Sequence, residues 1–411
     1  MTSEHYNSMK LDSSIEISRD AKILILSNAI ASLPWGYLSI IQPIYLDKIG
    51  IGSTLIGVLM TISGLTSALL AIPCGILSDK YGRKPFLIIS GFLYAFSMII
   101  YVVTTKYVYL AASSFLGGLA GAMFFPPWQA FLADKSTYQN REKVFSYSAF
   151  ASSVAMIIGS LLSGIPDCLQ IKLLIGQIES YKPMFLLTST LAIISTIILF
   201  PISETVRERV SKEIFPRKSI KVIAKFCLTG ALIGFGAGFI IPLFWYWFYL
   251  KFGVGGLVLG PISAITHAVM AIAFLAAPKL AKIIGTVNTI ILTQAMATVL
   301  LAIIPLVPDL IIVSVLYVVR NFLMNMSNPL QTAFMMSLVK PEERASASSM
   351  TGTAWMISNS ISPSMGGYII EHISLSLPFH ICATFYTTSI ILFYIFFHKV
   401  KLSEDGDIKT P

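Results

Sequence analysis

The sequence predicts an all-α membrane protein whose twelve spanning helices form two related six-helix halves. Three observations carry this prediction. Apolar residues make up 55% of the 411-residue chain and charged residues only 12%, which is about half the charged share of a soluble domain. Long apolar segments alternate with short polar ones, and the mean hydropathy is +0.78. Several short patterns in the first half recur at a constant distance in the second.

Twelve segments are long and apolar enough to cross a bilayer, which requires about 20 apolar residues in a helix. They lack the alternating pattern of a membrane-spanning strand, so each is expected to be a helix. In the first half they lie near 23–46, 54–77, 85–103, 107–133, 145–165 and 184–202. In the second half they lie near 226–250, 256–278, 288–307, 309–338, 348–370 and 375–398.

A charged stretch between the sixth and seventh segments divides the chain into its halves. We expect it to be a solvated linker at the membrane surface. The first residues are polar and are not followed by the short apolar core of a signal peptide. The predicted organisation is a tail over 1–22, a first bundle over 23–203, the linker over 204–225, a second bundle over 226–398 and a tail over 399–411.

The distribution of basic residues predicts the orientation. With both termini inside the cell, 23 of the 29 Lys and Arg residues lie on the cytoplasmic side and 5 lie outside. This asymmetry is typical of multi-pass proteins, and the plasma membrane is the expected location. The net charge of +9 then describes a surface that faces anionic lipid. It does not predict nucleic-acid binding, which would require basic clusters interleaved with aromatics on a soluble domain.

The two halves resemble each other at an offset of 203 residues. Lys48-Ile-Gly-Ile-Gly52 corresponds to Lys251-Phe-Gly-Val-Gly255. Gly159-Ser-Leu-Leu-Ser-Gly164 corresponds to Ser362-Pro-Ser-Met-Gly-Gly367. Several weak matches at nearly one offset indicate a duplicated six-helix unit. Related halves with a binding site between them are the architecture of many secondary transporters.

The loop between the second and third segments carries the most specific pattern, in which Gly75, Asp79, Gly82, Arg83 and Lys84 are spaced as G-x-x-x-D-x-x-G-R-K. It resembles the signature of the major facilitator superfamily, and the resemblance covers the whole chain except its polar tails. The resemblance implies a transporter that exposes a central cavity alternately to each side of the membrane. Whether the chain is closer to the drug-efflux branch or to the sugar-porter branch stays open.

The resemblance also implies a gate. Asp79 can meet the positive N-terminus of a facing helix, which in this family is the eleventh span. Arg83 can pair with Asp134 at the end of the fourth span, and Asp134 and Arg141 match the spacing of an acid–arginine pair in sugar porters. These contacts would latch the halves on the cytoplasmic side, with the cavity open outward. The alternative is that the basic residues of the motif only set the topology.

The second half does not keep the charges of this motif. Lys282 stands at the position of Asp79, and Thr286 at that of Arg83, so the latch is expected chiefly in the first half. The fifth span of antiporters in this family carries a Gly-Pro motif, but Ser160 occupies its proline position here. This departure weakens an assignment to drug–proton antiporters, and small residues at this spacing also serve helix packing.

The tenth span holds the densest group of polar residues. Asn321 and Asn325 share a helix face with Asn328, and Arg320 lies beside them. A charge this deep in a bilayer costs at least ~2.5 kcal/mol on insertion scales, so Arg320 should face a cavity or a partner. It either contacts an anionic or polar substrate group or is held by backbone carbonyls and asparagine side chains.

In this family the first, fourth, seventh and tenth spans line the cavity. Trp35, Trp128 and Trp355 lie deep in helices of the cavity region, where their rings either stack on a substrate or pack against other helices. We predict a small-molecule site with neither metal nor cofactor. Its predicted residues are Gln42, Trp128, Gln129, Arg320, Asn321, Asn325 and Gln331.

Coupling to an ion is the least determined feature. His267 lies in the middle of the eighth span and could carry a proton, because histidine titrates near neutrality. A neutral histidine bonded to a neighbouring helix is the alternative. The spans hold no Asp or Glu in their middle, which argues against the simplest proton-coupled mechanism. Facilitated diffusion, coupling through His267 and anion exchange at Arg320 remain.

Other classes of function are less favoured. The sequence has no phosphate-binding loop of an ATP-driven pump, and its four cysteines lack the spacing of a metal site or disulfide framework. We expect a monomeric transporter rather than an enzyme. Efflux of hydrophobic or cationic compounds and movement of a polar or anionic metabolite both stay open. A receptor built on this fold is the alternative from another class, and it would be expected to add a sizeable soluble domain.

Overall fold

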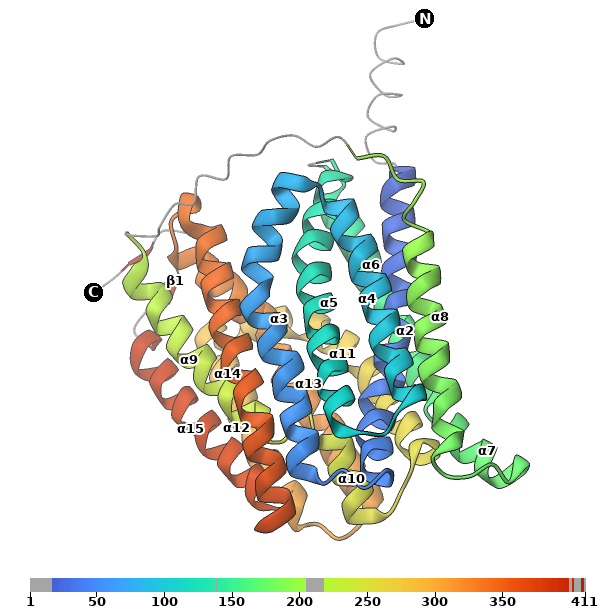
Figure 1. Cartoon of the computed structure of the whole chain (residues 1–411). Coiled ribbons are helices and arrows are strands. Elements are labelled where there is room, and N and C mark those ends of the chain that lie inside the picture. Colours follow the sequence, from blue (N-terminus) through green and yellow to red (C-terminus); the bar gives the residue numbers. More distant parts are fainter. Residues whose placement is uncertain (1–16, 138, 205–217, 399–400, 403–407, 410–411) are drawn as a thin grey trace, which may run out of the picture.

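The computed structural model describes residues 17–137, 139–204, 218–398, 401–402 and 408–409, and they form a bundle of long helices (Figure 1). The first half contains α2 (Arg19–Lys48), α3 (Ser53–Tyr81), α4 (Arg83–Val103), α5 (Tyr107–Asp134), α6 (Arg141–Leu162), α7 (Ile165–Leu173), a 3₁₀ turn (Glu179–Tyr181) and α8 (Lys182–Ile197). The second half contains α9 (Ile220–Gly238), α10 (Phe244–Phe252), α11 (Gly256–Ile284), α12 (Thr286–Ile303), α13 (Leu310–Leu338), α14 (Arg344–His372) and α15 (Leu377–Phe397), with 3₁₀ turns at Ile304–Leu306 and Pro341–Glu343. Two short strands, β1 (Lys401–Leu402) and β2 (Ile408–Lys409), pair antiparallel. The two predicted tails and the predicted linker lie for the most part outside the described residues.

The helices account for the twelve predicted spans. In the described part of the chain, nine helical stretches are long and apolar enough to cross a membrane by length and composition. The remaining three spans are α8, α11 and α14. Helix α8 has only 16 residues, and α14 carries many polar residues. Because α14 packs between α3 and α9, much of its polar surface contacts protein.

The boundaries of several spans differ from those predicted, among them the fifth, the sixth and the seventh. The seventh span is broken into α9 and α10, with Pro242 in the gap between them. Proline lacks an N–H and its ring displaces the preceding turn, which accounts for the break. The fifth span begins at Arg141, and the separate helix α7 follows it. The sixth span ends earlier than predicted, since α8 stops at Ile197.

The backbone repeats with the offset that the sequence shows. Gly50 and Gly253 have φ values of 86° and 67°, and Gly82 and Gly285 have values of 101° and 85°. The members of each pair are 203 residues apart. Glycine adopts such positive φ angles without the steric cost that other residues meet. The same tight turns therefore precede corresponding helices in both halves.

The halves meet at one end of the bundle, which we call the closed end; the opposite end, where Asp79 and Arg83 lie, is the motif end. Helix α3 lies against α14, and α6 lies against α11. A Cβ at Gly57 would overlap the Pro363 carbonyl, and one at Gly260 would overlap the Ser160 carbonyl. Gly260 is 203 residues after Gly57, and Ser160 is 203 residues before Pro363. The two contacts at the closed end are therefore equivalent under the internal repeat.

The motif end is open between the halves. One hydrophobic cluster contains residues of both halves and includes Tyr45 and Phe244. Two further clusters belong to single halves, around Phe131 in the first and Phe334 in the second. In Figure 1 α3 and α14 lie side by side near the bottom and separate toward the top, where α3 ends at the motif. The structure therefore shows the halves together at the closed end and apart at the motif end, which is not the state in which the motif would latch them, and the latch stays a prediction.

Candidate substrate cavity and motif

A cavity of about 600 Å³ lies mainly within the first half. Its size falls in the range of small-molecule sites. Helices α2, α3, α4, α5 and α8 form most of its wall, and α14 of the second half covers one side. The residues contributed by the second half are Pro242, Trp355, Met356, Asn359, Ser360 and Pro363.

Close packing of small residues shapes the cavity. Gly118 of α5 lies so near α3 that a Cβ there would overlap the carbonyl oxygen of Ser63. A Cβ at Gly91 of α4 would likewise overlap the Thr196 hydroxyl of α8. Helices approach closely in membranes where such residues face each other, and here this approach places Ser63 and Thr196 on the wall.

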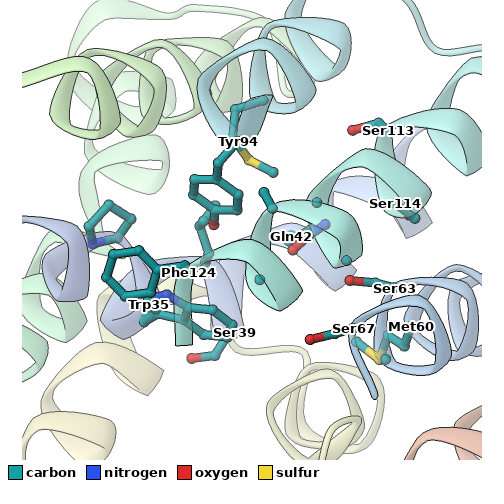
Figure 2. Close-up of a pocket in the computed structure, with 18 of the residues that line it drawn as sticks. Trp35, Ser39, Gln42, Met60, Ser63, Ser67, Tyr94, Ser113, Ser114 and Phe124 are labelled. Atoms are coloured by element: carbon teal, nitrogen blue, oxygen red, sulfur yellow. The ribbon is translucent and has the colours of Figure 1, made fainter. Parts of the chain in front are cut away.

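The wall combines aromatic rings with neutral polar groups. Figure 2 shows Trp35, Phe124 and Tyr94 on one side of the space and Ser63, Ser67 and Ser114 on the other. Trp35 is 51% exposed, and its ring is inclined at 59° to that of Phe125, with 6.4 Å between the ring centroids. A ring exposed to a cavity in this way can stack on an aromatic ligand.

Several polar groups on the wall are available to a ligand. Gln42 donates from Nε2 to the Tyr101 hydroxyl at 2.7 Å, which leaves its amide oxygen as an acceptor. The hydroxyls of Ser63, Ser67 and Tyr94 make no hydrogen bond to any residue that the structure describes. The lining contains no charged side chain among the described residues. The cavity therefore offers apolar contact and neutral hydrogen bonds.

Of the seven predicted binding residues, Gln42 lines this cavity. Trp128 lies behind the wall, where its ring stacks on Phe124 with 6.3 Å between the centroids, and its buried indole N–H has no partner in the described chain. Gln129 is an exposed residue of α5 outside the lining. Binding roles for Trp128 and Gln129 stay predictions. Many of the cavity residues that were not predicted are serines, such as Ser63 and Ser67, and serine hydroxyls occur throughout the apolar helices of this chain.

Arg320 of α13 points into the second half. It is 2% exposed, donates from Nη2 to the Tyr386 hydroxyl at 3.2 Å and from Nη1 to Asn321 Oδ1 at 3.3 Å. Its buried Nε has no partner among the described residues. Asn325 donates to the Asn321 carbonyl at 3.0 Å, and Gln331 is half-buried. In this state Arg320 and Asn325 bond to neighbouring residues of the protein, which agrees with the alternative that Arg320 is held by protein groups. A role of these residues in substrate binding stays a prediction.

Arg83 joins three helices at the motif end. It is 8% exposed and donates from Nη2 to Asp79 Oδ1 at 2.7 Å and from Nη1 to the Ala130 carbonyl at 2.7 Å. It also forms an ion pair with Asp134. The contacts connect α3, α4 and α5 within the first half. The carboxylate of Asp79, which could otherwise meet a helix of the second half, is held by Arg83.

Glu204 completes this corner and was not predicted. Its carboxylate accepts hydrogen bonds from the backbone N–H of Arg83 at 2.7 Å and of Lys84 at 2.9 Å, so it caps the start of α4. The Lys84 ammonium donates to the Phe200 carbonyl at 2.7 Å. Arg141 donates to the Ala133 carbonyl at 3.4 Å. A cap contributed from 120 residues away has no local sequence signal.

Glu343 plays a comparable part in the second half. It accepts hydrogen bonds from the backbone N–H of Lys218 at 3.0 Å and of Ser219 at 2.9 Å, which join the start of α9 to the turn before α14. The hydrogen bond from the Ser219 side chain, followed by those from the two N–H groups, lowers the pKa of the Glu343 carboxyl below its usual range.

This pKa shift predicts a dependence of stability on pH. Because the folded carboxyl has a depressed pKa, its stabilising contribution is complete above the unfolded pKa, about 4.3, and is lost as the pH falls through the folded value. Glu343→Gln is expected to reduce the fall in thermal midpoint between pH 7 and pH 4. The neighbouring exposed Glu342→Gln is the control, and an equal effect of both changes would contradict the assignment.

Comparison with known proteins identifies the family. The model of the Major Facilitator Superfamily matches residues 24–363. The chain belongs to this superfamily. Its members are membrane transporters that bind small-molecule substrates, so this superfamily protein is a multi-pass transporter. His267, the candidate proton site, is half-buried in α11, and neither a coupling ion nor a substrate follows from the family.

Named relatives extend over different shares of the chain. Multidrug resistance protein 1 of Bacillus subtilis (strain 168) is 22% identical over 374 residues, which cover 87% of this chain and 91% of that protein. The quinolone resistance protein NorA of Staphylococcus aureus is 26% identical over 124 residues, which cover 30% of this chain and 32% of that protein.

Solved structures confirm the predicted fold of this superfamily protein. A point mutant of the nucleoside transporter NupG has a TM-score of 0.74 at 14% identity, covering 92% of this chain and 100% of that chain. A bacterial homolog of the human lysosomal transporter Spinster, inward-facing and unoccupied, has a TM-score of 0.69 at 14% identity, covering 92% and 94%. At this identity the likeness concerns the fold alone, which is the twelve-helix fold of two bundles.

Proposed function

We propose that the protein transports neutral, largely apolar molecules that carry an aromatic part, by alternating access of the cavity described above. The observation that carries this proposal is the lining, which joins aromatic rings to unbonded hydroxyls and contains no charged side chain among the described residues. Burial of a ligand's apolar surface against such a wall favours binding, whereas burial of a charged ligand group without a partner disfavours it.

This chemistry favours one of the two substrate classes that the sequence left open. An anionic metabolite would need a cation on the wall, and Arg320 is bonded to Tyr386 and Asn321 instead. Relatives named for multidrug resistance and quinolone resistance support the class of hydrophobic compounds. We therefore propose efflux of drug-like molecules ahead of metabolite transport.

The motif end is proposed to face the cytoplasm of a plasma membrane. The support is the excess of Lys and Arg on that side, 23 against 5. Both tails and the basic linker over 204–225 would then be cytoplasmic. With this proposed orientation the structure would correspond to an inward-facing state, because the halves meet at the opposite end.

Transport of this class is testable in proteoliposomes containing the purified protein. Counterflow of a labelled neutral aromatic amphiphile is expected, with weaker counterflow of a matched carboxylate analogue. Counterflow of the anion in preference to the neutral compound would favour the metabolite class. Absence of counterflow for both, with saturable binding in a thermal-shift assay, would favour a receptor.

Trp35→Ala is expected to weaken binding of the neutral aromatic substrate about tenfold, because the exposed ring supplies stacking and apolar contact. The readout is the substrate concentration that gives half-maximal thermal stabilisation. Phe115→Ala is the matched control: it removes a 47% exposed ring from α5, outside the cavity lining. Equal affinities for Trp35→Ala and the unchanged protein would move the binding site away from this wall.

A further inference from the structure

A carboxylate of the second half caps a helix of the first half at the closed end. Glu371, near the end of α14, accepts a hydrogen bond at Oε2 from the backbone N–H of Thr54 at 2.7 Å. Thr54 is the second residue of α3. The first N–H groups of a helix have no partner within it and carry partial positive charge, so an anion is favoured there.

A carboxylate of the first half does the same for the second. Asp167 in α7 accepts a hydrogen bond at Oδ2 from the backbone N–H of Leu257 at 2.8 Å. Leu257 is the second residue of α11. Each half thus supplies the acid that caps the second spanning helix of the other half.

The two caps are related by the internal repeat. Thr54 and Leu257 are 203 residues apart, and each follows a repeated Lys-x-Gly-x-Gly segment. A Cβ on the last glycine of either segment, Gly52 or Gly255, would overlap the carboxylate of Glu371 or Asp167. The repeated glycines therefore leave the space that each carboxylate occupies.

The caps exist only while the halves touch. Opening the closed end separates Glu371 from α3 and Asp167 from α11, and exposes both helix N-termini to water. At the motif end the acid of the family signature, Asp79, is held by Arg83 of its own half. Among the described residues, Glu371 and Asp167 each cap a helix of the other half, and both lie at the closed end.

We propose that Asp167 and Glu371 are positioning residues of the transport cycle, which hold the closed end shut through reciprocal caps and so favour the inward-facing state. The proposal rests on the alternating-access function proposed above. Neither residue belongs to the cavity lining. Their removal changes the balance between the two states rather than the affinity of the inward-facing state for substrate.

The test is a distance measurement across the closed end in substrate-free protein. Spin labels are placed at the exposed positions Lys172 and Ile373, one in each half, after the four native cysteines are replaced. Asp167→Ala with Glu371→Ala is expected to raise the ratio of the long-distance to the short-distance population at least about tenfold, and each single change by less. Asp167→Asn with Glu371→Gln keeps an acceptor oxygen and is expected to give an intermediate shift.

Asp309→Ala is the matched control. Asp309 accepts a hydrogen bond from the N–H of Ile312 at 2.8 Å and so caps α13 of its own half. The substitution therefore removes a carboxylate cap that does not join the two halves. It is expected to leave the distance distribution unchanged. An unchanged distribution in the double alanine variant, with its thermal unfolding still cooperative, would overturn the proposal, as would an equal shift caused by Asp309→Ala.

The distance measurement is independent of the proposed substrate. If the double variant shifts the distance distribution while the unchanged protein transports no neutral aromatic compound, the role of the reciprocal caps is supported and the proposed substrate class is wrong. If the unchanged protein transports such a compound and the double variant keeps its short distance, the proposed substrate class is supported and the role of the reciprocal caps is wrong.

Discussion

Arg83→Ala is expected to lower the free energy of unfolding of the first bundle by about 2–4 kcal/mol. Arg83 is 8% exposed, and its guanidinium contacts Asp79, the Ala130 carbonyl and Asp134. Its removal leaves two carboxylates on neighbouring helices without their shared cation. The estimate lies below the full value for a buried pair because the two carboxylate side chains are 38% and 30% exposed.

A thermal unfolding series in detergent measures this effect. Arg83→Lys is expected to recover part of the stability, since it restores the charge but not the fork that reaches several acceptors. Thr286→Ala provides a control at the corresponding position of the second half and is expected to change the midpoint little. If Arg83→Ala were as mild as Thr286→Ala, the motif would serve topology only.

The second large effect is expected from Gly57→Leu. The glycine of α3 faces the backbone of α14, where an added Cβ would overlap the carbonyl oxygen of Pro363. Neither backbone can yield without separating the halves at the closed end. Overpacking of this kind typically costs about 1–3 kcal/mol, which changes a two-state balance about 5–150-fold. We expect transport to fall at least about tenfold, with the closed end held open.

Gly260→Leu repeats this experiment at the related contact with Ser160 and is expected to have a similar effect. Gly352→Leu is the control, because it adds the same side chain to α14 at a position where a Cβ meets open space. Counterflow and the distance between labels across the closed end are measured together. Normal transport by Gly57→Leu would mean that the halves do not need this contact during the cycle.

The cavity illustrates why part of the site could not be predicted. Gln42 was predicted and lines the wall, since a lone amide in an apolar segment is conspicuous. Ser63, Ser67 and Tyr94 also line it, but a serine hydroxyl can instead bond a backbone carbonyl of its own helix, and a tyrosine in an apolar segment can pack against another helix. Their roles depend on the rotation of each helix about its axis, which neither composition nor hydropathy specifies.

Arg320 illustrates the same limit from the other side. The sequence shows that Arg320 lies deep in the tenth span and that such a charge needs a partner. The sequence does not identify the partner, because Tyr386 lies 66 residues away on α15. Two directions around α13, toward the cavity or toward α15, satisfy the same sequence pattern.

The sequence by itself determined the membrane class, the spans, the family signature and the duplicated halves. These features follow from the length and hydropathy of local segments and from short repeated patterns, all of which are properties of the linear sequence. Only the tertiary structure decided which end of the bundle is closed and which carboxylates hold it. Asp167 meets Leu257, and Glu371 meets Thr54, across separations of 90 and 317 residues. Contacts of this kind depend on how two rigid bundles dock, and a change of docking alters them without altering a single helix.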